Sequence, residues 1–369
     1  MVLSHALTDF RADSLPTVSA EEVAQTFAQE VGLRYVHSNE PGIRRKRSGK
    51  TFRFIDSKNK PVVCEKTLAR IKALVIPPAW EDVWICAHAQ GHLQATGRDQ
   101  RARKQYRYHA EWSRARNENK FEHLRVFGES LPKIRRELDT ALSQPGLTKE
   151  KVFAATVQVM ELTKIRIGND VYASENDSYG LTTMLHEHTN IRGSTVKFKF
   201  KGKSGIHHEV KFSDPRLSRI IRRCQDLPGE ELFGYEDDQG NFHRIDSHDV
   251  NAYLRQISGR PISAKDFRTW GGTLRALEVL ISQGPADSRS QTAQKKRALS
   301  IIREVSEHLR NTVAVCRKYY VHPMVFSLDA DGTLHKIASS RKLRKAKGLS
   351  REEVILLNLL ARGEGSQNL

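Results

Sequence analysis

The sequence contains few cysteines and no long apolar segment. Its four cysteines, Cys64, Cys86, Cys224 and Cys316, stand far apart, and none forms the C-x-x-C pair typical of zinc or redox sites. We therefore expect free thiols in a reducing compartment. No segment approaches the roughly 18 apolar residues that cross a bilayer, and no signal-peptide core follows Met1. These absences predict a soluble cytoplasmic protein that has no membrane partner.

Three common catalytic signatures are also missing. The sequence has no G-x-x-x-x-G-K-[ST] phosphate loop, no H-E-x-x-H helix and no paired-carboxylate signature for two metal ions. We therefore expect no cofactor, neither a nucleotide nor a required metal. Side-chain cations and side-chain nucleophiles are what remains for chemistry.

Positive charge is what the sequence has in excess. It carries 61 Lys and Arg against 43 Asp and Glu, a formal net charge of +18. Such an excess attracts phosphate backbones over a long range and makes association strongly salt-dependent. A polyanionic partner is therefore expected. On charge alone, a basic protein without a nucleic-acid role stays the alternative.

The length of the chain and a change in the spacing of its apolar residues together predict two domains. A chain of 369 residues exceeds the usual size of one domain. Short apolar runs between Gly42 and about Ala95 are separated by turn residues, whereas later apolar residues recur at helical spacing. We predict an α+β protein with a strand-rich DNA-clamp domain at 1–112 and a larger, mainly helical catalytic domain at 113–369. The basic run 44–47 is expected in a loop of the first domain.

A β-hairpin is predicted inside the helical region. Residues 195–201 alternate with a period of two, Gly-Lys-Ser-Gly follows, and residues 206–212 supply a second strand. This pattern places Lys203 at the tip of the hairpin. An exposed turn lysine is usually only solvated, but a flexible ammonium in this place can also enter a DNA groove.

A cation-rich stretch at 96–108 ends in two aromatic residues and suits a surface that grips a DNA backbone. Lysine and arginine neutralise phosphates, while glutamine and tyrosine hydrogen-bond to phosphates or base edges. A solvated strand face is the alternative interpretation. The predicted DNA-binding residues are Arg101, Lys104, Gln105, Tyr106 and Tyr108.

Cutting a phosphodiester with a side chain requires a nucleophile, an acid and cations around the phosphorus. Arg166 follows an apolar helical run and suits either phosphate binding or helix capping. Arg268 falls in the first turns of a helix expected to begin near Ala264, where a buried ion pair is the alternative role. Tyr320 ends a short helical pattern that Pro323 must terminate. Because an unperturbed phenol has a pKa of about 10, it needs nearby cations to become a nucleophile.

Taken together, these residues resemble those of the type IB DNA topoisomerases, in the compact poxvirus and bacterial branch. The order and spacing of that family are matched by Arg166, Lys203, Arg268, Asn311 and Tyr320. The matching strings are K-I-R-I-G at 164–168, K-F-K-G-K at 199–203, K-D-F-R-T at 265–269 and Y-Y-V-H-P at 319–323. The resemblance covers about residues 40 to 330 of the chain.

The resemblance implies a fold of the type IB topoisomerase and tyrosine recombinase kind, and a mechanism. Tyr320 would attack the scissile phosphate to form a 3′-phosphotyrosyl link, Arg166 and Arg268 would hold the non-bridging oxygens, and Lys203 would protonate the leaving 5′ oxygen. Rotation and resealing would then relax supercoils without ATP or a metal. The resemblance also implies double-stranded DNA as the partner and a bacterial enzyme that works on the nucleoid in the cytoplasm. A monomer is the simplest expectation, because the two lobes of one chain can encircle a duplex.

Asn311 departs from the family pattern, because many members have histidine at this position. An amide donates one neutral hydrogen bond to a phosphate oxygen and cannot become cationic. Tyr319 adjoins the expected nucleophile, but the spacing of nine residues from Asn311 and the following Val-His-Pro favour Tyr320.

Two other functions stay open at this point. A tyrosine recombinase cuts by the same attack, but its second arginine normally lies in an H-x-x-R string, where this sequence has Lys265 in place of the histidine. A non-catalytic DNA-binding protein would use the same basic surface and would form no covalent adduct.

Overall fold

The computed structural model describes residues 20–49, 51–100, 102–286, 290–340 and 343–365. The chain separates into two compact units, Met1–Asn119 and Lys120–Leu369. The division falls inside the helix α3 (Ala110–Ser143), which is 34 residues long. The domain boundary predicted at residue 112 lies in the same helix.

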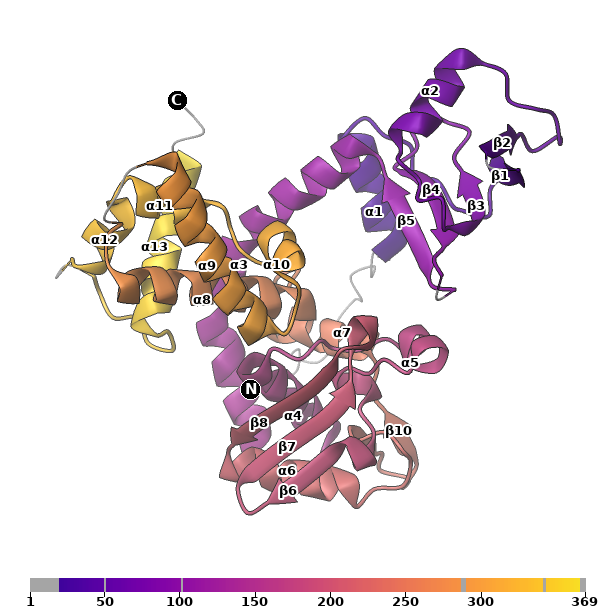
Figure 1. The fold of residues 1–369 in the computed structure, drawn as a ribbon. Coiled ribbons are helices and arrows are strands. Elements are labelled where there is room, and N and C mark those ends of the chain that lie inside the picture. Colours follow the sequence, from indigo (N-terminus) through magenta and orange to yellow (C-terminus); the bar gives the residue numbers. More distant parts are fainter. Residues whose placement is uncertain (1–19, 50, 101, 287–289, 341–342, 366–369) are drawn as a thin grey trace, which may run out of the picture. The chain divides into compact units, whose positions relative to one another are not determined.

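The N-terminal unit is built on a five-stranded antiparallel sheet with the strand order β2-β1-β3-β4-β5 (Figure 1). Its elements are α1 (Ala20–Glu30), β1 (Ile43–Ser48), β2 (Thr51–Ile55), α2 (Glu65–Ala73), β3 (Glu81–Ile85), β4 (Leu93–Arg98) and β5 (Lys104–Tyr108). Ile71 of α2 packs with Ile43, Val83 and Ile85 of the sheet. This small core confirms the strand-rich N-terminal region.

The basic run 44–47 lies in strand β1, so the prediction of a loop was wrong. The strand pairs with β2 from Arg44 to Ser48 on one side, and with β3 at Ile43 and Arg44 on the other. The Arg45 guanidinium donates to the carbonyl oxygens of Pro77 at 3.1 Å and Trp80 at 2.5 Å, and it lies 4.1 Å from the centroid of the Phe52 ring. An arginine with acceptors for its head group is compatible with a sheet position because its stem packs on the strand face.

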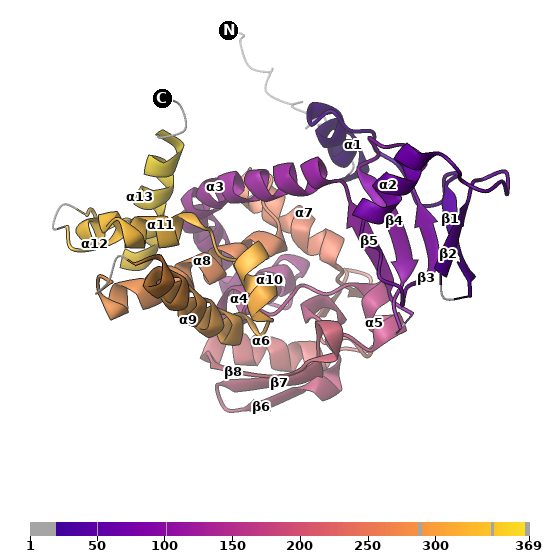
Figure 2. The ribbon, with the colours of Figure 1, turned by 45° about the horizontal axis from the view of Figure 1, so that its top comes forward.

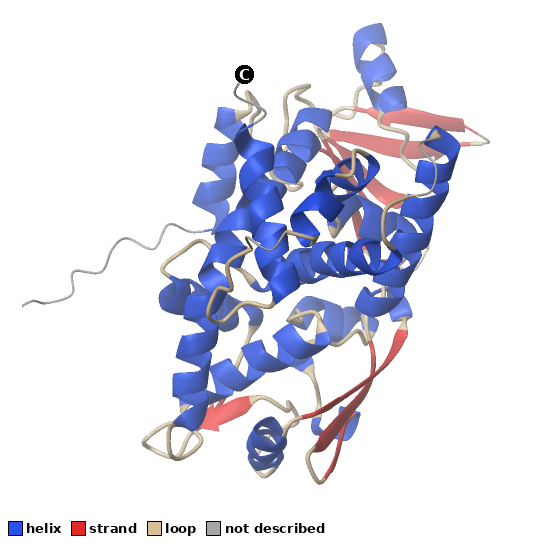
Figure 3. Ribbon diagram, turned by 90° about the vertical axis from the view of Figure 1, so that its left-hand side faces the viewer, coloured by secondary structure: helices blue, strands red, loops and turns tan. Residues whose placement is uncertain are grey.

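The second unit is mainly helical and carries two small sheets, β6-β7-β8 and β9-β10 (Figures 2 and 3). Beyond α3, its helices are α4 (Lys149–Thr163), α5 (Asp170–Asn176), α6 (Pro215–Gln225), α7 (Ser247–Ser258), α8 (Ala264–Gln283), α9 (Gln291–Leu309), α10 (Val313–Tyr319), α11 (Met324–Ala330), α12 (Thr333–Ala338) and α13 (Arg351–Gly365). Its strands are β6 (Thr189–Arg192), β7 (Thr195–Lys201), β8 (His207–Ser213), β9 (Gly234–Glu236) and β10 (Phe242–Arg244). The α+β architecture predicted from the sequence is confirmed.

Helix α4 is the central element of this unit. It contacts α6, α7, α8, β8 and β9, and it is buried along most of its length. Helix α8 packs in turn against α9, α11 and α13. One continuous hydrophobic core therefore joins the elements from which the candidate site residues come.

The predicted β-hairpin is confirmed in strand pair β7 and β8. The register runs from Thr195 opposite Ser213 to Lys201 opposite His207. Alternate residues of β7 enter the core, and the lysines between them face outward. The exposed Lys203 lies in the 3-10 turn Lys203–Gly205 that joins the two strands.

All four cysteines are free thiols, as predicted. Cys64 is exposed, whereas Cys86, Cys224 and Cys316 are buried. In the parts of the chain that the structure describes, no helix combines the length and the apolar character needed to cross a membrane.

Candidate active site

Four of the five predicted catalytic residues line a cavity of about 280 Å³ in the second unit. Arg166, Lys203, Arg268 and Tyr320 all line it, together with Lys265. The described residues of its wall therefore include four cations, and no carboxylate is among them. This composition suits an anionic ligand.

Arg166 is placed by the way helix α4 ends. Lys164 takes the left-handed conformation, with φ of 56°, and terminates the helix after Thr163. The chain then runs past Arg166, whose carbonyl oxygen accepts a hydrogen bond from the Leu181 N–H at 2.9 Å. The next residue pairs with Thr182 in the same way, at 2.7 Å. Two consecutive backbone contacts thus fix the segment that presents the Arg166 guanidinium.

Arg268 is buried in the first turns of α8, with 4% of its surface exposed. Ser263 and Asp266 form the capping box that begins this helix, as the sequence predicted. The guanidinium donates to the carbonyl oxygen of Lys164 and, at 2.9 Å, to that of Leu309. None of the ion pairs between described residues includes Arg268, and its Nε has no hydrogen-bond partner among them.

Asn311 lies beside Arg166 although the two are 145 positions apart in the sequence. The Arg166 Nη2 donates to Asn311 Oδ1 at 2.6 Å. Because a guanidinium can only donate, this contact fixes which end of the amide is the oxygen. The amide nitrogen, Nδ2, is buried and has no partner among the described residues. A hydrogen-bond donor therefore remains for a ligand.

Tyr320 follows directly after α10, and its backbone is held against α8. Its carbonyl oxygen accepts from Thr273 Oγ1 at 3.3 Å. At Gly272, an added Cβ would lie 2.5 Å from that same oxygen, so the close approach requires glycine. The guanidinium carbon of Arg268 lies 5.0 Å from the Tyr320 ring centroid. The neighbouring Tyr319 is 39% exposed and does not line the cavity.

The surroundings of Tyr320 favour its phenolate form. Burial raises the pKa of the phenol, but the positive charges of Arg268 and Arg166 outweigh this effect, and the pKa lies below its ordinary value. Burial, and then the charge of Arg166, lower the pKa of Arg268 to about 10. Arg268 therefore stays protonated at neutral pH and keeps its effect on the tyrosine.

Sequence reasoning missed several residues at the site, among them Lys265 and His208. Lys265 lies three residues before Arg268 on the same helix, so helical spacing was the available signal. His208 lies on the buried face of β8, and an added Cβ on Gly202 would come within 2.4 Å of its ring. Burial, followed by the charge of Arg166, lowers the pKa of His208 to about 4, so its ring is neutral at pH 7.

Four of the five predicted DNA-binding residues lie on the edge strand β5 of the N-terminal unit. Lys104, Tyr106 and Tyr108 share its exposed face, and the two tyrosine rings stack with their centroids 6.1 Å apart. Gln105 lies on the opposite face and donates to Asp99 Oδ2 at 2.9 Å. Arg101 lies outside the described residues. The strand therefore presents three of the five residues on one surface.

Two family models match the chain. The model for "Eukaryotic DNA topoisomerase I, catalytic core" matches residues 105–343, and that for "Bacterial DNA topoisomerase IB, N-terminal domain" matches residues 51–99. A DNA topoisomerase 1B of Acanthamoeba polyphaga mimivirus is 31% identical over 285 residues, which are 76% of this chain and 85% of the viral protein. The chain belongs to the type IB DNA topoisomerases.

Other relatives of this topoisomerase place it in the compact viral and bacterial branch. The DNA topoisomerase 1B of vaccinia virus is 22% identical over 265 residues, 70% of this chain and 79% of the viral protein. The DNA topoisomerase 1 of Mycosarcoma maydis is 23% identical over 244 residues, but these are only 24% of the fungal protein. The enzyme relaxes DNA by transient cleavage of one strand, and these relatives support neither the recombinase nor the non-catalytic alternative.

Proposed function

We propose that Tyr320 is the nucleophile of this topoisomerase. Its phenolic oxygen attacks the scissile phosphorus, the bond to the 5′ oxygen breaks, and the tyrosine becomes linked to the 3′ phosphate. The phenol gives its proton to solvent, and the departing 5′ oxygen takes a proton from the Lys203 ammonium. The position of Tyr320 in the cation-lined cavity, against Arg268, supports this assignment over Tyr319.

The observation that carries the proposal is a pair of buried N–H donors without acceptors. Asn311 Nδ2 and Arg268 Nε both lack a partner among the described residues, and the side chains that bear them contact the cavity or its lining. Buried donors are normally satisfied, so an unpaired one indicates a missing ligand. The non-bridging oxygens of a phosphate, held by Arg166 and Arg268, would supply two anionic acceptors.

Lys203 is the proposed general acid. Its exposed position at the hairpin tip allows the ammonium to reach a substrate oxygen, and it lines the same cavity as Tyr320. Positioned proton transfer of this kind contributes about 10²–10⁴-fold to a rate. Resealing reverses the steps: the 5′ hydroxyl attacks the phosphotyrosyl bond and returns its proton to Lys203. Because that bond conserves the energy of the cleaved link, we expect relaxation without a nucleotide or a required metal.

We propose that strand β5 contributes to binding of the DNA duplex. Lys104 offers a charge for a phosphate, and Tyr106 and Tyr108 offer hydroxyl groups on the same exposed face. One chain carries both this surface and the complete set of proposed catalytic residues. We therefore propose that the enzyme acts as a monomer.

The test uses supercoiled plasmid in the presence of EDTA and without ATP. We expect relaxation, and denaturation during turnover should trap a covalent protein–DNA adduct. Tyr320→Phe should abolish the adduct and retain DNA binding, whereas the matched Tyr319→Phe should cleave normally. Adduct formation by Tyr320→Phe, or its loss in Tyr319→Phe alone, would show that the nucleophile is assigned wrongly.

A further inference from the structure

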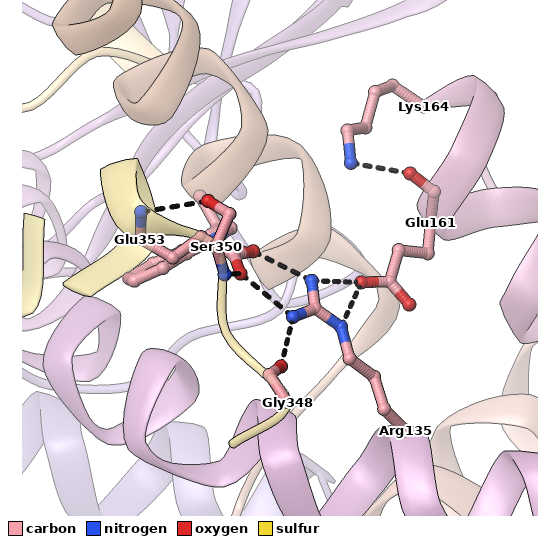
Figure 4. Close-up of polar contacts among 7 residues, drawn as sticks. Arg135, Glu161, Lys164, Gly348, Ser350 and Glu353 are labelled. Atoms are coloured by element: carbon pink, nitrogen blue, oxygen red, sulfur yellow. Dashed lines mark hydrogen bonds and ion pairs between the residues drawn. The ribbon is translucent and has the colours of Figure 1, made fainter. Parts of the chain in front are cut away.

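A charge network joins three helices of the second unit (Figure 4). Arg135 of α3 lies between Glu161 of α4 and Glu353 of α13. Its Nη2 donates to Glu161 Oε1 and to Glu353 Oε1, each at 2.7 Å, and its Nη1 donates to Glu353 Oε2 at 2.8 Å. The same Nη1 donates to the Gly348 carbonyl oxygen at 2.6 Å. The planar fork of an arginine is suited to such a set of acceptors.

The carboxylates of this network are shielded from solvent. The Glu353 side chain is 5% exposed and that of Glu161 is 11% exposed, against 30% for Arg135. Burial raises the pKa of Glu353, but hydrogen bonds from Arg135, Ser350 and Trp270, together with the Arg135 charge, outweigh this effect and lower the pKa overall. Burial opposes the charge of Arg135 as well, yet the two carboxylates raise its pKa. The Arg135 guanidinium and the Glu353 carboxylate are therefore charged near neutral pH, and loss of either one leaves the other poorly compensated.

One route from this network to the active site runs through the end of α4. The backbone carbonyl of Glu161 accepts a hydrogen bond from Lys164 Nζ, as Figure 4 shows. The carbonyl of Lys164 in turn accepts from the Arg268 guanidinium. The Lys164 stem also packs on α8, because an added Cβ on Gly271 would lie 2.7 Å from its Cε. The turn at Lys164, whose carbonyl binds Arg268, is thus connected to Glu161 by a hydrogen bond.

A second route runs through α8 itself. Trp270, two residues after Arg268, donates from its indole Nε1 to Glu353 Oε1 at 3.3 Å. The same ring packs on α3, where an added Cβ on Gly128 would lie 2.4 Å from it. Both the helix that carries Arg268 and the turn that accepts its hydrogen bond therefore contact the Arg135–Glu353 pair.

We propose that Glu353 and Arg135 are positioning residues for strand cleavage, which hold the end of α4 and helix α8 so that Arg268 stays against Tyr320. This inference rests on the proposed role of Tyr320. Helix α13 lies beyond residues 105–343, the part of the chain that the catalytic-core model matches. Helix α13 thus supplies the Glu353 carboxylate, which supports Arg268 indirectly through Trp270 and Arg135.

The proposal predicts a change in pH dependence. Several charged or titratable groups act on the Tyr320 phenol or line the same cavity. They are Arg268 and Lys265 from α8, Arg166 from the segment after α4, Tyr179 from the segment after α5, Lys203 from the hairpin and Cys316 from α10. If Arg268 moves away, the pKa of Tyr320 rises, and the phenolate forms at a higher pH. The cleavage rate, which increases with the phenolate fraction, then reaches its plateau at a higher pH.

The experiment measures single-turnover cleavage of a suicide duplex, whose cut strand dissociates, as a function of pH. Glu353→Gln is compared with Glu352→Gln, which removes the same charge one residue earlier, outside the network. For Glu353→Gln we expect a rate at pH 7 about tenfold lower and a rising limb about one pH unit more alkaline, since one pKa unit is a factor of ten. Affinity for an uncleaved duplex should stay unchanged. Identical pH profiles of the two variants, with only the melting temperature altered, would overturn the proposal.

A second variant guards against simple misfolding. Arg135→Lys keeps the charge and loses the fork, so it should show the same alkaline shift with a smaller loss of stability. If neither variant keeps the wild-type circular dichroism, the network is a folding element alone and the proposal fails. Tyr320→Phe separates this proposal from the one on which it rests. Cleavage by that variant would refute the nucleophile, whereas an inactive Tyr320→Phe with an unshifted Glu353→Gln would refute only the positioning role.

Discussion

Replacing Asn311 with alanine removes two hydrogen-bonding groups at the proposed phosphate site. One is the acceptor for Arg166 Nη2, 2.6 Å away, and the other is the buried Nδ2 donor that has no partner among the described residues. A fixed donor aimed at developing negative charge is worth about 10²–10³ in rate, or about 2.7–4 kcal/mol. We therefore expect single-turnover cleavage to slow by about two to three orders of magnitude. The affinity for duplex DNA should change little, because most binding comes from many backbone contacts.

Asn311→Asp separates the effects of the acceptor and the donor. The aspartate has nearly the same shape and keeps an acceptor for Arg166, but it loses the N–H donor and adds a negative charge beside the phosphate. If the donor matters, Asn311→Asp is at least as slow as Asn311→Ala. Recovery of most of the rate with the aspartate, despite its added charge, would mean that Asn311 only orients Arg166.

The assay follows formation of the covalent adduct after rapid quenching, at saturating enzyme and with duplex affinity measured separately. Saturation removes any effect of altered binding, so the difference reports the loss of transition-state stabilisation. A rate for Asn311→Ala within about threefold of wild type, less than 1 kcal/mol, would refute the donor role. Recovery of the rate in Asn311→Asp would refute it as well.

Three other substitutions follow from close contacts. Gly272→Ala places a Cβ 2.5 Å from the Tyr320 carbonyl oxygen, so both melting temperature and cleavage rate should fall, with overpacking costing about 1–3 kcal/mol; wild-type cleavage would contradict the contact. Gly202→Ala places a Cβ 2.4 Å from the His208 ring and should displace the neighbouring Lys203, the proposed general acid. Cleavage should therefore slow on a normal strand. It should recover on a strand in which sulfur replaces the 5′ bridging oxygen, because a thiolate leaves without being protonated. Equal slowing on both substrates would point instead to a general distortion. Tyr106→Ala should raise the Kd for duplex DNA by up to about tenfold, the loss of one hydrogen bond, and leave the cleavage rate at saturation unchanged; an unaltered Kd would exclude this tyrosine from the interface.

Local patterns in the sequence were sufficient to predict much of the fold. The alternation over 195–201 and 206–212 predicted the hairpin, and the structure pairs these strands. The capping-box spacing at Ser263 predicted the start of α8 at Ala264. Such features depend on residues a few positions apart, so their physical causes are visible in the sequence.

Contacts between distant residues could not be predicted in this way. Four consecutive cations at 44–47 show no apolar alternation, and their strand is supported by pairing with β2 and β3 and by distant carbonyls that accept the Arg45 guanidinium. The Arg166–Asn311 hydrogen bond spans 145 positions, and Arg135 reaches Glu353 across 218. Family resemblance grouped the catalytic candidates, but it offered no sign of the residues that support them.

The distribution of the cysteines gives this enzyme a natural site for a probe. Burial raises the pKa of Cys316 to about 11 and that of Cys224 to about 12, and it also raises the pKa of Cys86, so these thiols react slowly at neutral pH. Hydrogen bonds from Thr67 lower the pKa of the exposed Cys64. A maleimide dye should therefore attach to the N-terminal unit at one place, without a substitution anywhere in the chain. Fluorescence from that dye would follow the response of the N-terminal unit to DNA while the active site remains chemically untouched.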